Sequence, residues 1–304
     1  MASGVTAGGV AAGGVAAGAV QAGGATEEGA TGGAAGPAAY KPAASRTAAF
    51  RAMAAGAAAA GARLLLGLLV AGLLWEGAVI AFGIRPAYLP RLSTVLAAIA
   101  ATPGAYFDGF MRTLAETLIG FAAGTAVGVL NGVAFFRWPA LRDMLFPVFV
   151  VSQTIPVIAF GALVVLWFGN TLLAKAVIAF YLTFFPVTVN TLLGLQSVDP
   201  AQVALLRSFG ASRGSILRRL QLPAALPQVF VALRLGASLS LVGAIVGEWF
   251  GDTTGLGVLL LQAMYAENVV GLWAAILCAA ALGTGFYAAV AEAERRLVFW
   301  GQEG

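Results

Sequence analysis

Charged side chains are scarce in this sequence. Only 10% of its 304 residues are Asp, Glu, Lys or Arg, whereas 60% are hydrophobic. A soluble domain carries about 25% charged residues, so the chain lacks the polar surface that a water-soluble globule of this size requires. Together with a mean hydropathy of +0.91, this composition excludes an ordinary soluble protein and points to a chain that folds in lipid.

Histidine is absent, and cysteine occurs once, as Cys278. Without histidine the chain lacks the commonest metal ligand and the commonest general base, and we predict no metal site and no catalytic residue. An intramembrane protease would need paired aspartates, a Ser/His pair or an H-E-x-x-H motif. The candidate aspartates, Asp108, Asp143, Asp199 and Asp252, all fall at the ends of apolar stretches or between them.

Lysine is equally rare, with only Lys41 and Lys175. Neither follows a glycine, so the phosphate-binding loop G-x-x-x-x-G-K-[ST] of ATPases is missing. We therefore expect no ATP hydrolysis on this chain. The net charge of +4 would suggest a nucleic-acid partner in a soluble protein, but here the distribution of the basic residues gives a better explanation, and no nucleic-acid partner is predicted.

Long apolar stretches fill most of the remaining sequence. A membrane-spanning helix needs about 20 predominantly apolar residues, and six stretches meet this requirement. Prolines inside them, such as Pro156 and Pro186, are tolerated in membranes where neighbouring helices satisfy the freed backbone groups. We predict an all-α polytopic membrane protein with about six spans, at residues 63–82, 113–136, 145–168, 174–195, 228–250 and 270–290.

The first 45 residues differ from the rest, since they form a low-complexity tract of Gly, Ala, Val, Ser and Thr. Such a tract buries too little apolar area to offset its conformational entropy. We predict a disordered tail over residues 1–45, with a regulatory tail as the alternative, followed by a transmembrane domain over residues 46–304.

The basic residues give the orientation. If the N-terminus is cytoplasmic, 13 of the 17 Lys and Arg residues lie on or near the inner side, and only Arg85, Arg91, Arg112 and Lys175 lie outside. Basic residues concentrate on the cytoplasmic side of membrane proteins. We therefore predict that both termini are cytoplasmic.

The loop over residues 196–227, between the fourth and fifth spans, carries the clearest local signals. Asp199 is a good N-cap and Pro200 suits the first helical position, so a helix can run to Phe209, where Gly210 ends it. A second, basic helix is predicted from Ser212 to just before Pro223. By itself the loop fits two roles, an interfacial helix touching anionic headgroups and a docking helix for a cytoplasmic partner.

The spacing of Gly210 from the run Leu220-Gln221-Leu222-Pro223 resembles the EAA loop of permeases from binding-protein-dependent ABC importers. The sequence departs from that motif at its first triplet, which is Ala204-Leu205-Leu206 and lacks the acidic residue. Further motifs resemble the nitrate, sulfonate and taurine subgroup, which includes permeases for thiamine-precursor pyrimidines. They are Ser152–Pro156, Leu166–Gly169, Phe184–Pro186, Asn190-Thr191 and Gly247–Gly251 with Gly255–Gly257.

The resemblance implies a type I ABC importer permease fold in the bacterial inner membrane. It implies a second permease copy, forming a homodimer, two cytoplasmic ATPase subunits that hold the ATP and Mg, and an extracytoplasmic binding protein that sets much of the selectivity. No cofactor is expected on this chain. The resemblance places contacts to the ATPase on the 196–227 loop, at Leu206, Arg207, Ser208, Phe209, Gly210, Ala211 and Ser212.

Two sets of residues inside the spans have open interpretations. Gly120, Gly124, Gly128 and Gly132 recur every four residues and form a strip that either packs closely against another helix or lines a pathway. A set of polar residues in apolar spans must face protein or water, so it either joins helices by hydrogen bonds or lines a translocation pathway. Its members are Asn131, Gln153, Thr154, Thr183, Thr188 and Asn190.

Two acidic residues near the outer end of the fifth span, Glu248 and Asp252, are interpreted as surface residues, with the mouth of a pathway as the alternative. The main rival function is an ion-coupled secondary transporter, which would use intramembrane acidic residues. The spans hold few acids, such as Glu116 and Glu248, and the sequence shows no clear internal repeat. These features favour the ABC permease.

Overall fold

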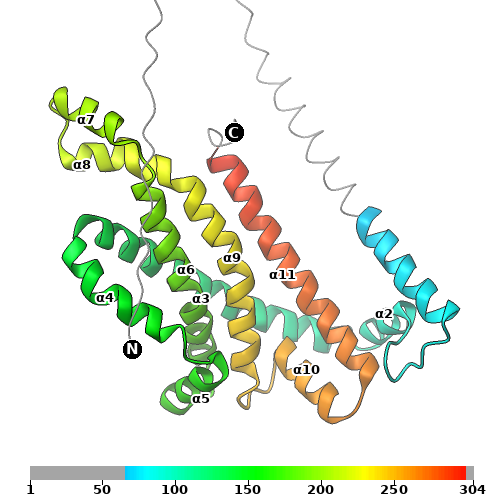
Figure 1. Ribbon diagram of the computed structural model, residues 1–304. Coiled ribbons are helices and arrows are strands. Elements are labelled where there is room, and N and C mark those ends of the chain that lie inside the picture. The colour runs from blue at the N-terminus through cyan, green and yellow to red at the C-terminus, as the bar shows by residue number, and fades with distance from the viewer. Residues whose placement is uncertain (1–65, 299–304) are drawn as a thin grey trace, which may run out of the picture. The chain divides into compact units, whose positions relative to one another are not determined.

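The computed structural model describes residues 66–298, and every regular element in this range is a helix (Figure 1). The tail predicted over residues 1–45 lies outside the described residues. An apolar helix, Leu66–Ala81, comes first in the described part. It is followed by α2 (Leu92–Ala101), α3 (Pro103–Arg137), α4 (Pro139–Ser152), α5 (Val157–Phe168), α6 (Leu172–Gln196), α7 (Pro200–Ser208), α8 (Arg213–Ile216), the π-helix η1 (Leu217–Gln221), α9 (Leu222–Glu248), α10 (Leu256–Tyr265) and α11 (Val269–Leu297).

Four helices of the described range are long and apolar enough to cross a membrane, namely α3, α6, α11 and the continuous run Arg213–Glu248. The predicted spans 113–136, 174–195 and 270–290 lie within α3, α6 and α11, and span 228–250 overlaps α9. The first predicted span begins outside the described residues and continues as the helix Leu66–Ala81. The expectation of an all-α membrane protein is confirmed.

The centre of the bundle is α6, which packs along its length against both α3 and α9. More than half of its side chains are buried, and hydrophobic and small residues occur all around it. A helix that is apolar on every side is typical of a buried position. By contrast, α3 exposes apolar side chains such as Ile119 and Leu130, as expected for a surface that faces lipid.

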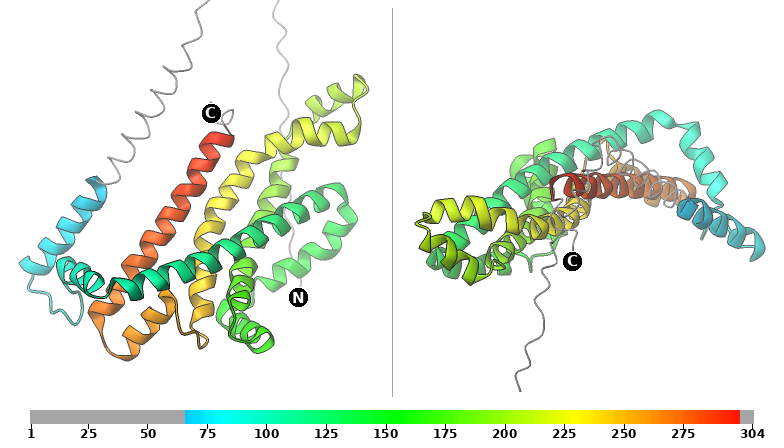
Figure 2. Two further views of the ribbon diagram at one scale, coloured as in Figure 1. Left: turned by 180° about the vertical axis from the view of Figure 1, so that it is seen from behind. Right: turned by 90° about the horizontal axis from the view of Figure 1, so that it is seen from above.

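At 1.5 Å per residue, the 35 residues of α3 extend about 52 Å, well beyond a hydrocarbon core of about 30 Å. A helix this long must tilt or project from the bilayer. Figure 2 shows α3 running obliquely across α6, α9 and α11.

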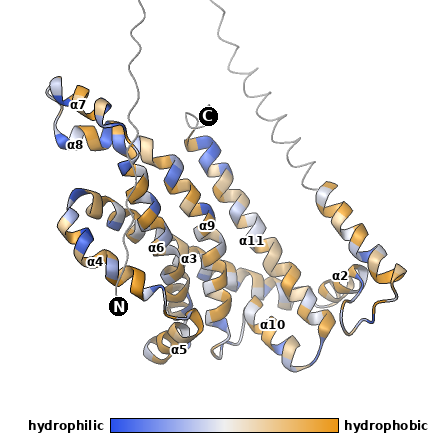
Figure 3. Ribbon diagram, viewed as in Figure 1, coloured by the Kyte–Doolittle hydropathy of each residue, from blue (hydrophilic) through white to orange (hydrophobic). Residues whose placement is uncertain are grey.

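Hydrophilic residues gather on α7 and α8 and at the end of α11 (Figure 3).

The third predicted span, 145–168, is divided between α4 and α5, which together are long and apolar enough to form one broken span. The chain bends by 98° between α4 and α5. Ile155 precedes a proline, which disfavours the helical conformation, and Pro156 itself is extended with ψ of 130°. The bend is held against α6, because the Tyr181 hydroxyl donates to the Ser152 carbonyl and the Tyr181 ring stacks on Phe160 at 4.0 Å.

The helix predicted from Ser212 to a point before Pro223 does not stop there. It continues through η1 into α9, so that Arg213–Glu248 forms one 36-residue run. A proline inside a helix removes a hydrogen bond and crowds the carbonyl four residues earlier. The wider π turn over Leu217–Gln221 comes just before Pro223 and accommodates the proline. Residue composition alone does not reveal such a turn.

Candidate functional site

The loop between α6 and α9 folds as a helix–turn–helix at one end of the bundle (Figure 1). Asp199 caps α7, with its carboxylate 2.8 Å from the amide nitrogen of Ala201. Gly210 turns the chain with φ of +78°, a conformation that strains residues bearing a Cβ. Ser212 then caps the next helix by accepting a hydrogen bond from the Ser215 amide at 3.2 Å. The capping and turn residues act as the sequence predicts.

The short helix α7 has two opposite faces. Leu205 and Phe209, four residues apart, are 57% and 79% exposed. Val203 and Arg207 lie about half a helical turn away and line a small cavity. Leu206, one of the predicted contact residues, is half-buried. Sequence reasoning therefore missed Leu205, although its four-residue spacing from Phe209 was a signal that it shares a face with that residue.

The other residues predicted on this loop complete the turn. Ser208 is exposed and its hydroxyl donates to the Leu205 carbonyl at 2.7 Å. The amide of Ala211 donates to the Leu206 carbonyl at 3.0 Å, which closes the turn around Gly210. These contacts are local, so they fix the shape of the loop and leave the Leu205/Phe209 face open to solvent.

The glycine strip forms the contact between α3 and α6. All four glycines are buried, and each faces a residue of α6 that is also part of a four-residue repeat. A methyl group added at Gly124, Gly128 or Gly132 would lie 2.5–2.7 Å from a Cβ of α6, well inside van der Waals contact. The facing residues are Ala179, Thr183, Val187 and Thr191. The strip lets two backbones approach closely, as small residues do in membrane proteins.

The predicted polar residues fall into two groups. Thr183 and Thr188 are fully buried, and their hydroxyls donate to carbonyls of α6 itself. Asn190 accepts a hydrogen bond from the Gln228 amide of α9 at 3.0 Å. These three residues therefore bond within the packed helices of one copy.

The second group consists of Asn131, Gln153 and Thr154. Asn131 and Gln153 are half-buried and Thr154 is exposed. Gln153 and Thr154 lie at the bend between α4 and α5, and the Gln153 side-chain nitrogen has no hydrogen-bond partner among residues 66–298. These three side chains lie nearer the surface of the bundle than Thr183 and Thr188 do.

At the opposite end of the bundle, a buried polar cluster joins α3, α6, α9 and the start of α10. Glu248 is only 1% exposed, so its interpretation as a surface residue was wrong. Its carboxylate accepts hydrogen bonds from the Thr113 hydroxyl and from the Gly257 amide, each at 2.5 Å. The Thr113 hydroxyl in turn accepts from the Leu256 amide at 2.9 Å. Glu248 and Thr113 thus satisfy the free amides that begin α10.

Charged residues complete this cluster. Glu116, fully buried, has its carboxylate 2.9 Å from the Arg112 guanidinium, and Lys175, also fully buried, lies 2.8 Å from Asp252. Burial by itself raises the pKa of Asp252, but contact with Lys175 and the nearby Arg112 outweigh it and hold that pKa below its ordinary value. Sequence reasoning missed Thr113 and Lys175, since their partners are distant in sequence.

Comparison with known proteins now identifies the chain. Residues 120–298 match the family model described as the inner membrane component of binding-protein-dependent transport systems. The chain belongs to that family. The match spans the glycine strip, the α7 turn and α9 through α11, which are the elements described above.

Individual relatives of the chain are also transport permeases. The permease is 34% identical over 227 residues to the formylaminopyrimidine transport permease protein ThiX of Halalkalibacterium halodurans, covering 74% of this chain and 90% of the relative. It is 31% identical to the riboflavin transport system permease protein RibX of Chloroflexus aurantiacus, covering 74% and 85% of the two chains. It is 29% identical to the taurine transport system permease protein TauC of Escherichia coli, covering 71% and 82%.

A solved structure of an inward-facing methionine ABC transporter, MetNI, resembles the permease with a TM-score of 0.57. The likeness covers 64% of this chain and 96% of the other, at 19% identity, and it confirms the predicted type I ABC importer permease fold. The permease is thus a multi-pass protein of the inner membrane and a transporter subunit, not an enzyme.

Proposed function

We propose that this permease imports a small polar solute and is driven by a separate ATPase that docks on the 196–227 loop. The observation that carries the proposal is the exposed pair Leu205 and Phe209. Two large apolar side chains on a capped, nine-residue helix are costly to leave in water. A protein partner that buries them explains their exposure.

The loop is also connected directly to the central helices. The helix after Gly210 continues without a break into α9, so a displacement of α7 reaches the centre of the bundle. The acidic residue of the usual motif is replaced by Ala204. Docking here would therefore depend on apolar contact at Leu205 and Phe209, with Leu206, Arg207, Ser208, Ala211 and Ser212 shaping the turn.

We infer that a second copy of the chain completes the pathway, and the packing of the first copy supports this. Because Thr183 and Thr188 are fully buried between α6 and its neighbours, one copy leaves no room for a solute beside them. A pathway would instead run between two copies, and Asn131, Gln153 and Thr154 are the predicted polar residues near enough to the surface to line it. A homodimer with two ATPases and an external binding protein fits this arrangement.

The relatives guide the substrate class. Their names refer to formylaminopyrimidine, riboflavin and taurine, and others to aliphatic sulfonates and nitrate. We propose a nitrate-, sulfonate- or taurine-like anion or a thiamine-precursor-like nitrogenous compound. Uptake of the labelled compounds by cells carrying the permease with its ATPase and binding protein would identify the class, and equal uptake in cells lacking the permease would contradict it.

The coupling test replaces the exposed pair. Leu205→Asp with Phe209→Asp should leave the protein inserted in the membrane, but it should abolish uptake and release the partner ATPase subunit during purification. Gly210→Val should act in the same direction, because φ of +78° strains a β-branched residue. Measurements are cell uptake and ATPase recovery from detergent extracts.

The matched control is Ala201→Asp with Gln202→Glu, which adds the same charge to exposed positions of α7 and keeps both apolar side chains. It should retain the ATPase. If the Leu205/Phe209 double variant still transports at the wild-type rate with its ATPase bound, the coupling proposal is wrong and an ion-coupled transporter becomes the better account.

A further inference from the structure

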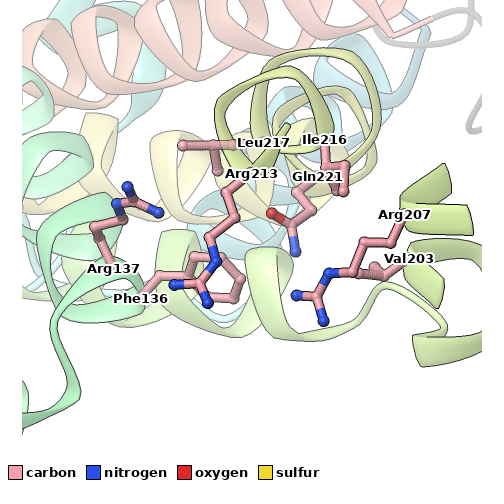
Figure 4. Close-up of a pocket in the computed structure, with 8 residues that line it drawn as sticks. All are labelled: Phe136, Arg137, Val203, Arg207, Arg213, Ile216, Leu217 and Gln221. Atoms are coloured by element: carbon pink, nitrogen blue, oxygen red, sulfur yellow. The ribbon is translucent and has the colours of Figure 1, made fainter. Parts of the chain in front are cut away.

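A small basic cavity lies between the end of α3, α7 and the helical run α8–η1. Its volume is about 110 Å³, enough for several water molecules and therefore for a tetrahedral oxyanion. Arg137 comes from α3, Arg207 from α7 and Arg213 from α8, and the Gln221 amide lies beside them. Figure 4 shows the Arg213 guanidinium between those of Arg137 and Arg207.

The three arginines have no partner of opposite charge. Among residues 66–298, no carboxylate lies within ion-pair distance of Arg137, Arg207 or Arg213. Five basic residues elsewhere in this range pair with a carboxylate three or more residues away in sequence. All three arginines are exposed, so water and salt screen part of the repulsion between them. An anion in the cavity would remove that repulsion, and guanidinium groups bind phosphate oxygens in a bidentate manner.

We infer that this cavity binds a phosphate group, supplied by the headgroup of an acidic phospholipid. α3 is one of the membrane-spanning helices, and it ends at Arg137. The next residue, Trp138, is 59% exposed, as is common for tryptophan at the membrane interface. We therefore place the cavity at the level of the lipid phosphates, and Phe136 and Val203 give it an apolar side.

The cavity is separate from the proposed ATPase contact. Val203 and Arg207 line it, whereas Leu205 and Phe209 project from the opposite face of α7. A lipid held by Arg207 and Arg213 would therefore bind without covering the Leu205/Phe209 pair, and it would tie the α7 turn to the end of α3. Lipid binding and ATPase docking can consequently be tested by different variants.

The test uses the full-length permease in nanodiscs of phosphatidylcholine with an equal part of phosphatidylglycerol. After transfer to detergent, native mass spectrometry counts the phosphatidylglycerol molecules that remain bound. Arg207→Gln with Arg213→Gln should lower retention on the order of tenfold, since two charge-assisted contacts are lost. Arg137→Gln alone should lower it too, although it lies on a different helix.

The control is Arg218→Gln with Arg219→Gln, which removes two exposed charges from η1 outside the cavity. It should retain the lipid as the wild type does. In nanodiscs of phosphatidylcholine alone, Arg207→Gln with Arg213→Gln should unfold at a temperature no lower than the wild type, because the repulsion has been removed. A lower unfolding temperature of this double variant would show that it is misfolded. Lipid retention by Arg137→Gln would then test the inference.

A second arm separates the two sources of phosphate. The unfolding temperature of the detergent-solubilised protein is measured in sodium phosphate and in sodium chloride at equal ionic strength. In one outcome, phosphate raises the unfolding temperature only when Arg207 and Arg213 are present, while the wild type retains no lipid. That result would support a phosphate site but overturn a lipid as its source. Equal loss of lipid in both double variants, or no response in either arm, would overturn the inference. The inference would also be overturned if the cavity variants lost the ATPase but kept the lipid. In that case the arginines would bind a carboxylate of the ATPase.

Discussion

Lys175 of α6 places its ammonium nitrogen 2.8 Å from the Oδ2 of Asp252, and the Lys175 side chain is fully buried. Asp252 follows α9, so this ion pair joins the start of one central helix to the end of another. Lys175 also donates to the Asn170 side chain, which itself donates to the Gly251 carbonyl. The pair is thus one part of a network that closes the α10 end of the bundle.

Asp252→Asn should destabilise the protein by about 3 kcal/mol, because removing one partner of a buried pair leaves the other charge uncompensated. The measurement is the unfolding midpoint of the purified protein in detergent. The control is Asp143→Asn, which breaks the exposed pair with Arg142 and should cost about 0–1 kcal/mol. Equal effects of the two substitutions would contradict the structural role of Lys175 and Asp252.

The same pair gives a pH dependence with a definite sign. Since the folded pKa of Asp252 is lowered, its contribution is fully present above the ordinary aspartate value of about 4. It is lost as the pH falls through the lowered pKa. The stability difference between the wild type and Asp252→Asn should therefore be constant from about pH 5 to 7 and narrow in more acidic solution.

The glycine strip predicts a steric effect on assembly. Gly124→Leu or Gly128→Leu should separate α3 from α6 and lower the yield of folded protein, and even alanine at these positions should cost about 1–3 kcal/mol through overpacking. Gly104→Ala is the matched control on α3, because a methyl group there meets no atom within 4 Å. The measurements are the yield and the elution profile of the protein after detergent extraction. A wild-type yield and elution profile for Gly124→Leu and Gly128→Leu would show that the strip does not hold the helices together.

The predicted topology can be tested by labelling. Ser212 lies on the α7 turn and Thr253 between α9 and α10, and both are exposed. In a Cys278→Ala background, single cysteines at these positions should react from opposite sides of the membrane, with position 253 labelled from outside intact cells. Labelling of both positions by an impermeant reagent would contradict cytoplasmic termini.

Local patterns in the sequence predicted several features correctly. Apolar stretches indicated the long helices, and the four-residue glycine repeat indicated a flat face on α3, since both depend only on helical periodicity. The turn at Gly210 followed from capping preferences, which are also local. The size of the bend between α4 and α5 did not follow from the sequence, because proline is compatible with both a kinked span and a broken one. Contacts of Tyr181 with Ser152 and Phe160 accompany the broken form.

Hydropathy, helical periodicity and turn chemistry act over a few residues, and they are enough to indicate an all-helical membrane protein with a structured turn between two spans. Which side chains meet depends on how the helices pack. Only packing brings Thr113, Lys175, Glu248 and Asp252 into one buried cluster and sets three arginines from different helices around one cavity. Such convergence depends on how α3, α6 and α9 cross, and the crossing is fixed by the mutual fit of their surfaces and not by any single segment.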